Sequence, residues 1–236
     1  MSEKIIVSVC SPIHNEVENI PALVARVSAV MTPLFGQQWE QILVDDASTD
    51  GSNQCMQALQ ARFSTLKLHT HSAQMKERAA WQTAFDHACG DVVVLMAGDL
   101  QAPPEEIPKL LKPVLHEGLD VGTGFRQNRK DGFYYWLATR LLNAGMRLAF
   151  DLNVKDASSS FFAVRRKFVQ RLPMIENDHR YILAIFKQRN ATIKEVACHH
   201  AARVTGQSHY KKTKVLHAIP EIFRFYMRYK AGHYHL

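Results

Sequence analysis

The chain has 236 residues, of which 47% are hydrophobic and 22% are charged. This length and composition fit one globular domain with a substantial core and exclude a disordered or fibrous protein. The net charge of +7 favours anionic partners, which include phosphorylated substrates, acidic lipid and nucleic acid. No run of 18 apolar residues and no signal-peptide region is visible, so no transmembrane helix is expected. Four dispersed cysteines indicate reduced thiols in the cytosol.

Strand-like and helix-like segments alternate along the first 124 residues. The predicted strands are residues 5–11, 41–44, 66–70, 91–96 and 119–123. The intervening helices begin near Asn19 and after Gly51, and span residues 74–88 and 104–116. The apolar stripe of the first helix consists of Ile20, Leu23, Val24, Val27 and Met31. Strands joined by helices of this length predict right-handed βαβ units, a mostly parallel sheet and an α/β fold.

The alternation is less regular beyond about residue 124. A helix at about residues 136–150, a strand at 161–164, a further helix, a strand at 193–197 and a long C-terminal helix are expected. No internal repeat, low-complexity segment or linker interrupts the chain. Residues 1–236 are therefore interpreted as a single domain.

Acidic and amide side chains follow the predicted strands. Glu16 follows the first strand, Asp45 and Asp50 follow the second, and Asp99 and Gln101 follow the fourth. In a parallel sheet, ligands bind beyond the carboxyl ends of the strands. Clustered carboxylates repel one another unless a cation or ligand donors compensate them, so this edge predicts a binding site. Asp50 also has an ordinary interpretation as a helix cap or turn residue before glycine. The absence of G-x-G-x-x-G after the first strand argues against a dinucleotide site.

Four segments occur in order along the chain, namely VSVCSPIHNEVENIPAL, ILVDDASTDGS, GDVVVLMAGDLQAPPEEI and RVTGQSHYKKTKVL. Together they resemble the family 2 inverting glycosyltransferases of GT-A fold. The polyprenyl-phosphate sugar transferases, of the dolichol-phosphate mannosyltransferase type, are the most similar subgroup. The resemblance extends from about Val7 to Lys214, and the second and third segments are specific only in combination. It implies a GT-A-like, Rossmann-related sheet flanked by helices.

The resemblance also implies a nucleotide-diphospho-sugar donor and a set of site residues. The expected donor-binding residues are Pro12, Asn15, Glu16, Asp45, Ser48, Asp50, Gln101 and Lys211. Asp99 and Gln101 would face the diphosphate and a Mg²⁺ or Mn²⁺ ion. The chain departs from the family's D-x-D pattern, because Ala97 stands in the first acidic position. A divalent ion needs only one or two carboxylates when substrate phosphates complete its shell, so weak, donor-dependent metal binding is expected.

Two later segments are assigned to the acceptor side by the same resemblance. Asp156 precedes a polar loop and is a candidate base or acceptor-positioning group, with a turn or cap as its alternative role. Arg203 is expected to act in catalysis, since Arg binds phosphate in a bidentate manner, and Lys211 lies in the same basic segment. An exposed loop without a role in the site is the alternative for this segment.

The C-terminal segment predicts a basic amphipathic helix. Ile219, Ile222, Phe223 and Tyr226 recur at helical spacing, and the stretch from Arg203 to Lys230 contains seven Lys or Arg residues against one acid, Glu221. Such a helix fits an anionic membrane surface. The alternative is that its apolar stripe packs on the domain.

Together these features predict a glycosyltransferase that moves a sugar from a nucleotide donor to a polyprenyl phosphate with inversion. Residues 1–124 would form the nucleotide-sugar-binding half, residues 125–214 the acceptor half, and residues 215–236 the C-terminal helix. A peripheral, cytoplasmic location at the inner membrane face is expected, with no nucleic-acid partner. Two alternatives stay open: transfer to a glycan hydroxyl with Asp156 as base, and a non-catalytic nucleotide-sugar or lipid-phosphate binding protein, which Ala97 suggests.

Overall fold

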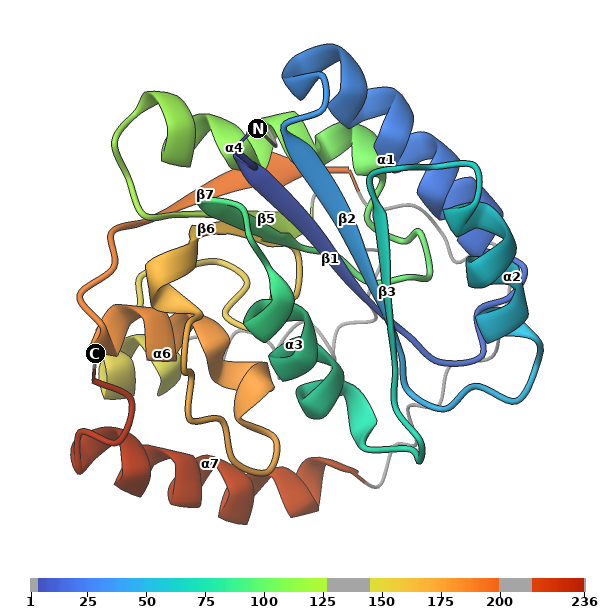
Figure 1. Cartoon of the computed structure of the whole chain (residues 1–236). Coiled ribbons are helices and arrows are strands. Elements are labelled where there is room, and N and C mark those ends of the chain that lie inside the picture. Colours follow the sequence, from blue (N-terminus) through green and yellow to red (C-terminus); the bar gives the residue numbers. More distant parts are fainter. Residues whose placement is uncertain (1–3, 127–144, 200–213, 236) are drawn as a thin grey trace.

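A computed structural model of the chain describes residues 4–126, 145–199 and 214–235. Arg203 and Lys211 lie outside these ranges, as does most of the helix expected at residues 136–150. The end of that segment, residues 145–150, is helical. Figure 1 shows a central sheet with helices packed on both of its faces.

Within the described ranges, the sheet contains seven strands in the order β3-β2-β1-β4-β6-β5-β7. The strands are β1 (Val7–Ile13), β2 (Trp39–Asp45), β3 (Leu66–Thr70), β4 (Val92–Leu95), β5 (Val121–Arg126), β6 (Phe162–Arg165) and β7 (Ile193–Cys198). Strand β6 is antiparallel to β4 and β5, whereas the other neighbouring pairs are parallel. The prediction of a mostly parallel sheet in an α/β fold is confirmed.

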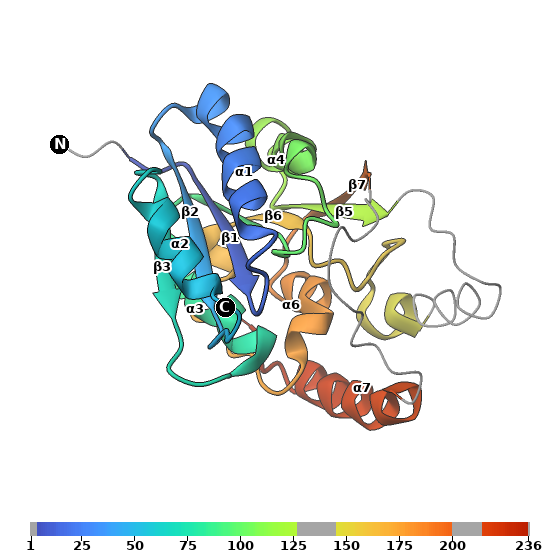
Figure 2. The same cartoon turned by 90° about the vertical axis from the view of Figure 1, so that its right-hand side faces the viewer.

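Two layers of helices enclose two hydrophobic cores. The helices are α1 (Ile20–Phe35), α2 (Ser52–Gln60), α3 (Lys76–His87), α4 (Ile107–His116), α6 (Ile182–Gln188) and α7 (Lys214–Lys230), with 3-10 turns η1 (Pro104–Glu106), η2 (Arg166–Phe168) and η3 (Asp178–Tyr181). Helices α1, α2 and α4 lie on one face of the sheet and α3, α6 and α7 on the other (Figures 1 and 2), and each group contributes to one of the cores. Val92 and Val94 face the first core while Val93 and Leu95 face the second, because successive strand residues point to opposite faces.

The predicted elements of the first half agree closely with the structure. The third strand has the expected bounds, and the whole apolar stripe of α1 is buried. The helix expected at 104–116 begins as a 3-10 turn and becomes α-helical at Ile107, with Pro108 in its first turn, where a missing amide donor is tolerated. Strand β5 extends three residues beyond the prediction, because its end pairs with β7 up to Arg126 and Cys198.

The apolar residues predicted for the C-terminal helix are divided between two faces, since Ile222 and Tyr226 pack against the core whereas Phe223 faces outward. Phe223 is 63% exposed, whereas Phe225 is fully buried. Phe225 stacks on Tyr181 with 4.5 Å between ring centroids and on Tyr234 with 5.4 Å. These rings, far apart in the sequence, fix the rotation of α7, so its inner face packs on the domain. In the described ranges, no helix is long and apolar enough to cross a membrane.

Candidate functional site

The loops that leave β1 and β2 are joined by reciprocal hydrogen bonds. The Asn15 amide donates to Ser48 Oγ at 2.9 Å, and the Thr49 amide donates to Asn15 Oδ1 at 2.8 Å. The Glu16 amide donates to Ser52 Oγ at 3.0 Å. The predicted site residues Asn15, Glu16 and Ser48 therefore lie together at the carboxyl edge of the sheet, and Pro12 is the last residue but one of β1.

Asp45 ends β2 and is almost completely buried. Its Oδ1 accepts a hydrogen bond from the Ser48 amide at 3.0 Å, and its Oδ2 accepts one from Asn53 Nδ2 at 3.1 Å. Only 1% of the residue is exposed. Asp45 therefore fixes the loop after β2 and keeps a carboxylate within the sheet edge.

Asp50 connects the two loops. Its Oδ2 accepts a hydrogen bond from the Val17 amide at 3.0 Å, and its Oδ1 accepts bonds from the Ser52 amide and hydroxyl at 2.9 and 2.6 Å. Partial burial opposes ionisation, but these hydrogen bonds outweigh it and lower the pKa of Asp50. The next residue, Gly51, has a φ of +94°, a backbone conformation that glycine adopts without strain. Asp50 thus also stabilises the turn before α2, which is the alternative role that the sequence suggested.

Asp46 forms a contact to which the sequence analysis assigned no role. Its carboxylate accepts hydrogen bonds from the amides of Met75 and Lys76, both at 2.7 Å, and lies 2.8 Å from His71 Nδ1. The opposite ring nitrogen of His71 lies 2.9 Å from Thr83 Oγ1. Asp46 therefore ties the end of β2 to the start of α3. In the sequence, the acid that directly follows Asp45 is the signal that could have pointed to this contact.

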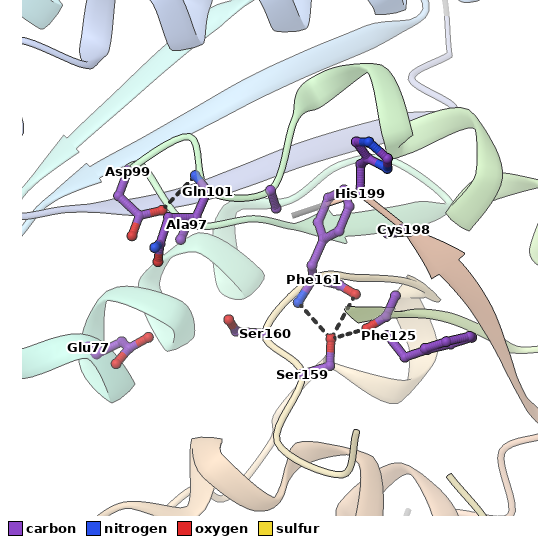
Figure 3. Close-up of a pocket in the computed structure, with 12 residues that line it drawn as sticks. Glu77, Ala97, Asp99, Gln101, Phe125, Ser159, Ser160, Phe161, Cys198 and His199 are labelled. Carbon is purple, nitrogen blue, oxygen red and sulfur yellow. Dashed lines mark hydrogen bonds between the residues drawn. The ribbon is translucent and has the colours of Figure 1, made fainter. Parts of the chain in front are cut away.

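A cavity of about 210 Å³ opens beside these loops at the end of β4. Its lining residues are Glu77, Ala97, Asp99, Gln101, Ala102, Gly124, Phe125, Ser159, Ser160, Phe161, Cys198 and His199. Figure 3 shows that Asp99, Ala97 and Gln101 lie on one side and His199 on the other. Asp99 and Gln101 are the predicted site residues that line it. Glu77, the two serines and His199 were not among the site residues predicted from the sequence.

The turn after β4 holds Asp99 in a fixed position. Asp99 is 7% exposed, and its Oδ1 accepts a hydrogen bond from the Gln101 amide at 3.1 Å. A Cβ atom on Gly98 would lie 2.6 Å from the side chain of Ile13, so glycine permits the close approach of this turn to β1. Leu100 has a φ of +57°, which adds to the sharp reversal of the chain. A rigid turn therefore presents one carboxylate and one amide side chain to the cavity.

Glu77 brings a second carboxylate to the cavity from the first turn of α3. Its Oε2 lies 3.5 Å from Nε2 of His179. Burial opposes ionisation of Glu77, but His179 and the nearby Arg180 outweigh it and lower the pKa of Glu77. The cavity consequently has an acidic side. Among the described residues, no group of three His, Cys, Asp or Glu side chains is positioned to hold a metal ion.

Asp156 precedes the loop that lines the cavity, but Asp156 itself is not a lining residue. It is 9% exposed, its amide donates to Glu195 Oε1 at 3.0 Å, and its Oδ1 accepts a hydrogen bond from Ser158 Oγ at 3.1 Å. The loop that follows it supplies Ser159 and Ser160 to the lining. Ser159 Oγ donates to the Gly124 carbonyl at 2.6 Å, as Figure 3 shows, and so fixes this loop against β5.

Comparisons with known proteins identify close sequence relatives. The chain is 32% identical over 222 residues to the undecaprenyl-phosphate 4-deoxy-4-formamido-L-arabinose transferase of Salmonella dublin, covering 92% of this chain and 66% of that protein. The corresponding protein of Aeromonas hydrophila is 32% identical over 206 residues, covering 87% of this chain and 63% of that protein. The chain thus spans about two thirds of the length of these relatives.

Solved structures share the fold. Glucosyl-3-phosphoglycerate synthase from Mycobacterium tuberculosis, in complex with Mn²⁺ and UDP-glucose, superposes with a TM-score of 0.69 at 20% identity, covering 96% of this chain and 79% of that one. Mannosyltransferase PcManGT from Pyrobaculum calidifontis, in complex with GDP-Man and Mn²⁺, gives 0.63 at 18% identity, covering 87% and 59%. These similarities confirm the predicted GT-A-like architecture.

The family model described as "Glycosyl transferase family 2" matches residues 8–172. This range contains the loops after β1 and β2, the turn with Asp99 and the serine loop before β6. The match covers more than half of the chain and agrees with the sequence relatives and with the fold. The chain belongs to glycosyl transferase family 2.

Proposed function

We propose that the protein transfers a sugar from a nucleotide-diphospho-sugar to a polyprenyl phosphate with inversion at the anomeric carbon. The observation that carries this proposal is the 32% identity, over 92% of this chain, to an undecaprenyl-phosphate sugar transferase. The cavity at the end of β4 agrees with it, because it combines a fixed carboxylate with polar groups at the edge where parallel sheets bind ligands.

The donor nucleotide would bind at the joined loops after β1 and β2. Their geometry supports this role, because the hydrogen bonds among Asn15, Ser48 and Thr49 fix two loops that would otherwise lose conformational freedom on binding. Asp45 and Asp50 keep their carboxylates in place through backbone donors. We assign Pro12, Asn15, Glu16, Asp45, Ser48 and Asp50 to this subsite.

The turn after β4 offers only part of the ligand set that a divalent cation needs. Carboxylate and amide oxygens are the ligands that Mg²⁺ and Mn²⁺ prefer, and Asp99 and Gln101 offer one of each at the cavity wall. Ala97 offers none, so donor phosphates would have to complete the shell. A cation held there would neutralise the negative charge that develops on the leaving diphosphate. Arg203 and Lys211 are proposed to contribute to the same charge compensation.

A phosphate acceptor suits the arrangement better than a hydroxyl acceptor. The second pKa of a phosphate monoester is about 6, so the acceptor oxygen is already ionised near neutral pH and needs no base. Transfer to a glycan hydroxyl would require a general base in reach of the acceptor. Asp156 is the candidate for that base, and it lies outside the cavity lining. Asp156 is therefore proposed to position the acceptor side of the site.

The proposal is tested by incubating the protein with a panel of labelled nucleotide sugars, with and without undecaprenyl phosphate, and extracting the product into organic solvent. Label should enter the organic phase only when the lipid phosphate is present, and EDTA should reduce the rate. Label transferred to a soluble glycan instead would contradict the lipid acceptor. Nucleotide-sugar binding without transfer to either acceptor would indicate a non-catalytic binding protein.

The proposal includes contact of α7 with an anionic membrane at its cytoplasmic face. Phe223 and Met227 are 63% and 53% exposed and lie one helical turn apart. Arg224 and Lys230 are exposed beside them. An outer helix face that combines large apolar groups with cations fits the interface of an anionic bilayer, where a lipid-phosphate acceptor resides.

Two of the cations that suggested membrane binding form ion pairs within the protein. Arg224 Nε lies 3.2 Å from Glu176 Oε2, and Arg228 pairs with Asp178. The apolar pair should therefore contribute more to membrane binding than the net charge does. We expect Phe223→Asp with Met227→Asp to reduce sedimentation with phosphatidylglycerol vesicles severalfold. Leu34→Asp on α1 is the matched control, since Leu34 is also 53% exposed. Equal sedimentation of the double variant and the unaltered protein would contradict the role of α7.

A further inference from the structure

A second cavity, of about 560 Å³, lies away from the one that contains Asp99. It is lined by the last part of α3 with Phe85 and Asp86, by the segment after β6 with Arg166, Lys167 and Arg171, by Arg189 after α6, and by His235 near the C-terminus. The Arg166 amide donates to the Asp91 carbonyl at 2.9 Å, directly before β4, whereas Asp99 follows the end of that strand. The two cavities therefore lie at opposite ends of β4.

The lining of this second cavity is strongly cationic. Among the described residues, four that line it carry a positive charge, namely Arg166, Lys167, Arg171 and Arg189, against one carboxylate, Asp86. Within the described residues, these four cations form one ion pair, between Lys167 Nζ and Asp120 Oδ1, and its distance of 3.7 Å is long. Like charges gathered in this way repel one another unless an anion compensates them, so the cavity favours an anionic ligand.

Arg189 is the buried part of this cluster. The residue is 5% exposed, and Nε donates to the Tyr234 carbonyl at 2.7 Å. Its Nη1 donates to the carbonyls of Phe168 and Gln170 at 3.1 and 3.2 Å. Burial lowers the pKa of Arg189. Carbonyl dipoles satisfy its donors but carry no net charge, so a positive charge is held at the base of the cavity.

The same contacts preorganise the cationic segment. By binding the carbonyls of Phe168 and Gln170, Arg189 fixes the backbone that presents Lys167 and Arg171 to the cavity. Arg166 is anchored more loosely, by a 3.4 Å bond from Nη1 to the Ala88 carbonyl. Planar guanidinium groups suit bidentate binding of phosphate oxygens, and a backbone that is already fixed loses little conformational entropy when a ligand binds.

We propose that this second cavity is a binding site for a phosphate group, separate from the site of sugar transfer. The phosphate would come from a soluble phosphorylated molecule or from a phospholipid headgroup, and both present the same anionic oxygens. The inference does not rest on the proposed transferase activity. Helix α3 contacts both cavities, with Glu77 at its start and Phe85 and Asp86 at its end.

Titration calorimetry with inorganic pyrophosphate, at constant ionic strength and with EDTA present, tests the site. EDTA removes divalent cations and so suppresses phosphate binding at Asp99. We expect Arg166→Gln with Arg171→Gln to weaken binding roughly tenfold or more, which corresponds to about 1.4 kcal/mol. Arg62→Gln, a change of one exposed arginine on another part of the surface, and Asp99→Asn should leave binding unchanged. Arg189 is left intact, because its carbonyl contacts support the fold.

Vesicles distinguish the two sources of phosphate. If the protein binds phosphatidylglycerol vesicles but not pyrophosphate, and the double variant loses this vesicle binding, the site is assigned to a lipid headgroup. Pyrophosphate binding that is lost in the double variant would assign it to a soluble ligand. Arg171→Gln alone, at an exposed side chain, provides a second variant if the double variant unfolds. Unchanged binding in these variants, or no binding of either probe by the unaltered protein, would overturn the proposal.

Discussion

Two regions of the protein hold carboxylates in different ways. In the edge loops, which are residues 14–17 and 45–52, the donors to Asp45 and Asp50 include backbone amides and a hydroxyl. In the α7 support, which is residues 175–189 with 220–234, Asp178 is 1% exposed and pairs with Arg228. It also accepts a hydrogen bond from the Tyr234 hydroxyl at 2.6 Å.

The difference separates the proposed donor-binding edge from a structural support. In the edge loops, neutral donors orient the carboxylates of Asp45 and Asp50 and do not compensate their negative charge. In the α7 support an arginine compensates the acid, and stacked aromatic rings surround the pair. Substitutions should therefore affect stability most in the α7 support and activity most at the sheet edge.

The largest effect is expected from Phe225→Ala. This ring is fully buried between Tyr181 and Tyr234, and truncation of a buried Phe costs roughly 3–5 kcal/mol. Phe223→Ala, two residues away on the exposed face of the same helix, should change stability by less than about 0.5 kcal/mol. Urea denaturation of both variants measures the difference. Similar losses of stability in the two variants would mean that the buried ring of Phe225 does not hold α7 on the domain.

The next effect concerns activity at the sheet edge. Asp99→Asn removes the charge that the turn after β4 presents to the cavity and should lower the rate of sugar transfer by about 100-fold, a loss typical of one electrostatic group at a reacting centre. Asp91→Asn is the matched control, because Asp91 precedes the same strand and pairs with Lys4 on the surface. Equal rates for the two variants, measured with saturating Mn²⁺, would remove Asp99 from the proposed site.

The smallest effect concerns the pH dependence of stability. Hydrogen bonds lower the pKa of Asp50 in the folded state below its ordinary value of 3.8. The associated stability is therefore fully present above that value and is lost as the pH falls through the lower, folded pKa. Asp50→Asn should make the loss of stability between about pH 6 and about pH 3 shallower. Asp86→Asn, at an exposed carboxylate of α3, provides the control for urea midpoints across this range. An identical pH profile for both variants would contradict the stabilising role of Asp50.

The sequence predicted the first half of the fold well, because its signals are local. A short apolar strand, a helix stripe and a turn before glycine depend on neighbours within a few residues. The strand exits at Glu16, Asp45 and Asp99 followed directly from them. The sequence did not decide which face of α7 packs on the domain. Phe225 was not part of the predicted apolar stripe, and only its partner rings show that it is buried whereas Phe223 is exposed.

By itself, the sequence determined the glycosyl transferase family, the mostly parallel sheet and the edge at which Asp99 and Gln101 meet. Only the tertiary structure decided that Asp46 ties β2 to α3, that Glu77 reaches the cavity, and that a cationic cavity assembles at the other end of β4. The physical reason is sequence separation. The cationic cavity combines side chains from α3, the segment after β6, the end of α6 and the C-terminus, and no local pattern encodes which of these distant cations share one space.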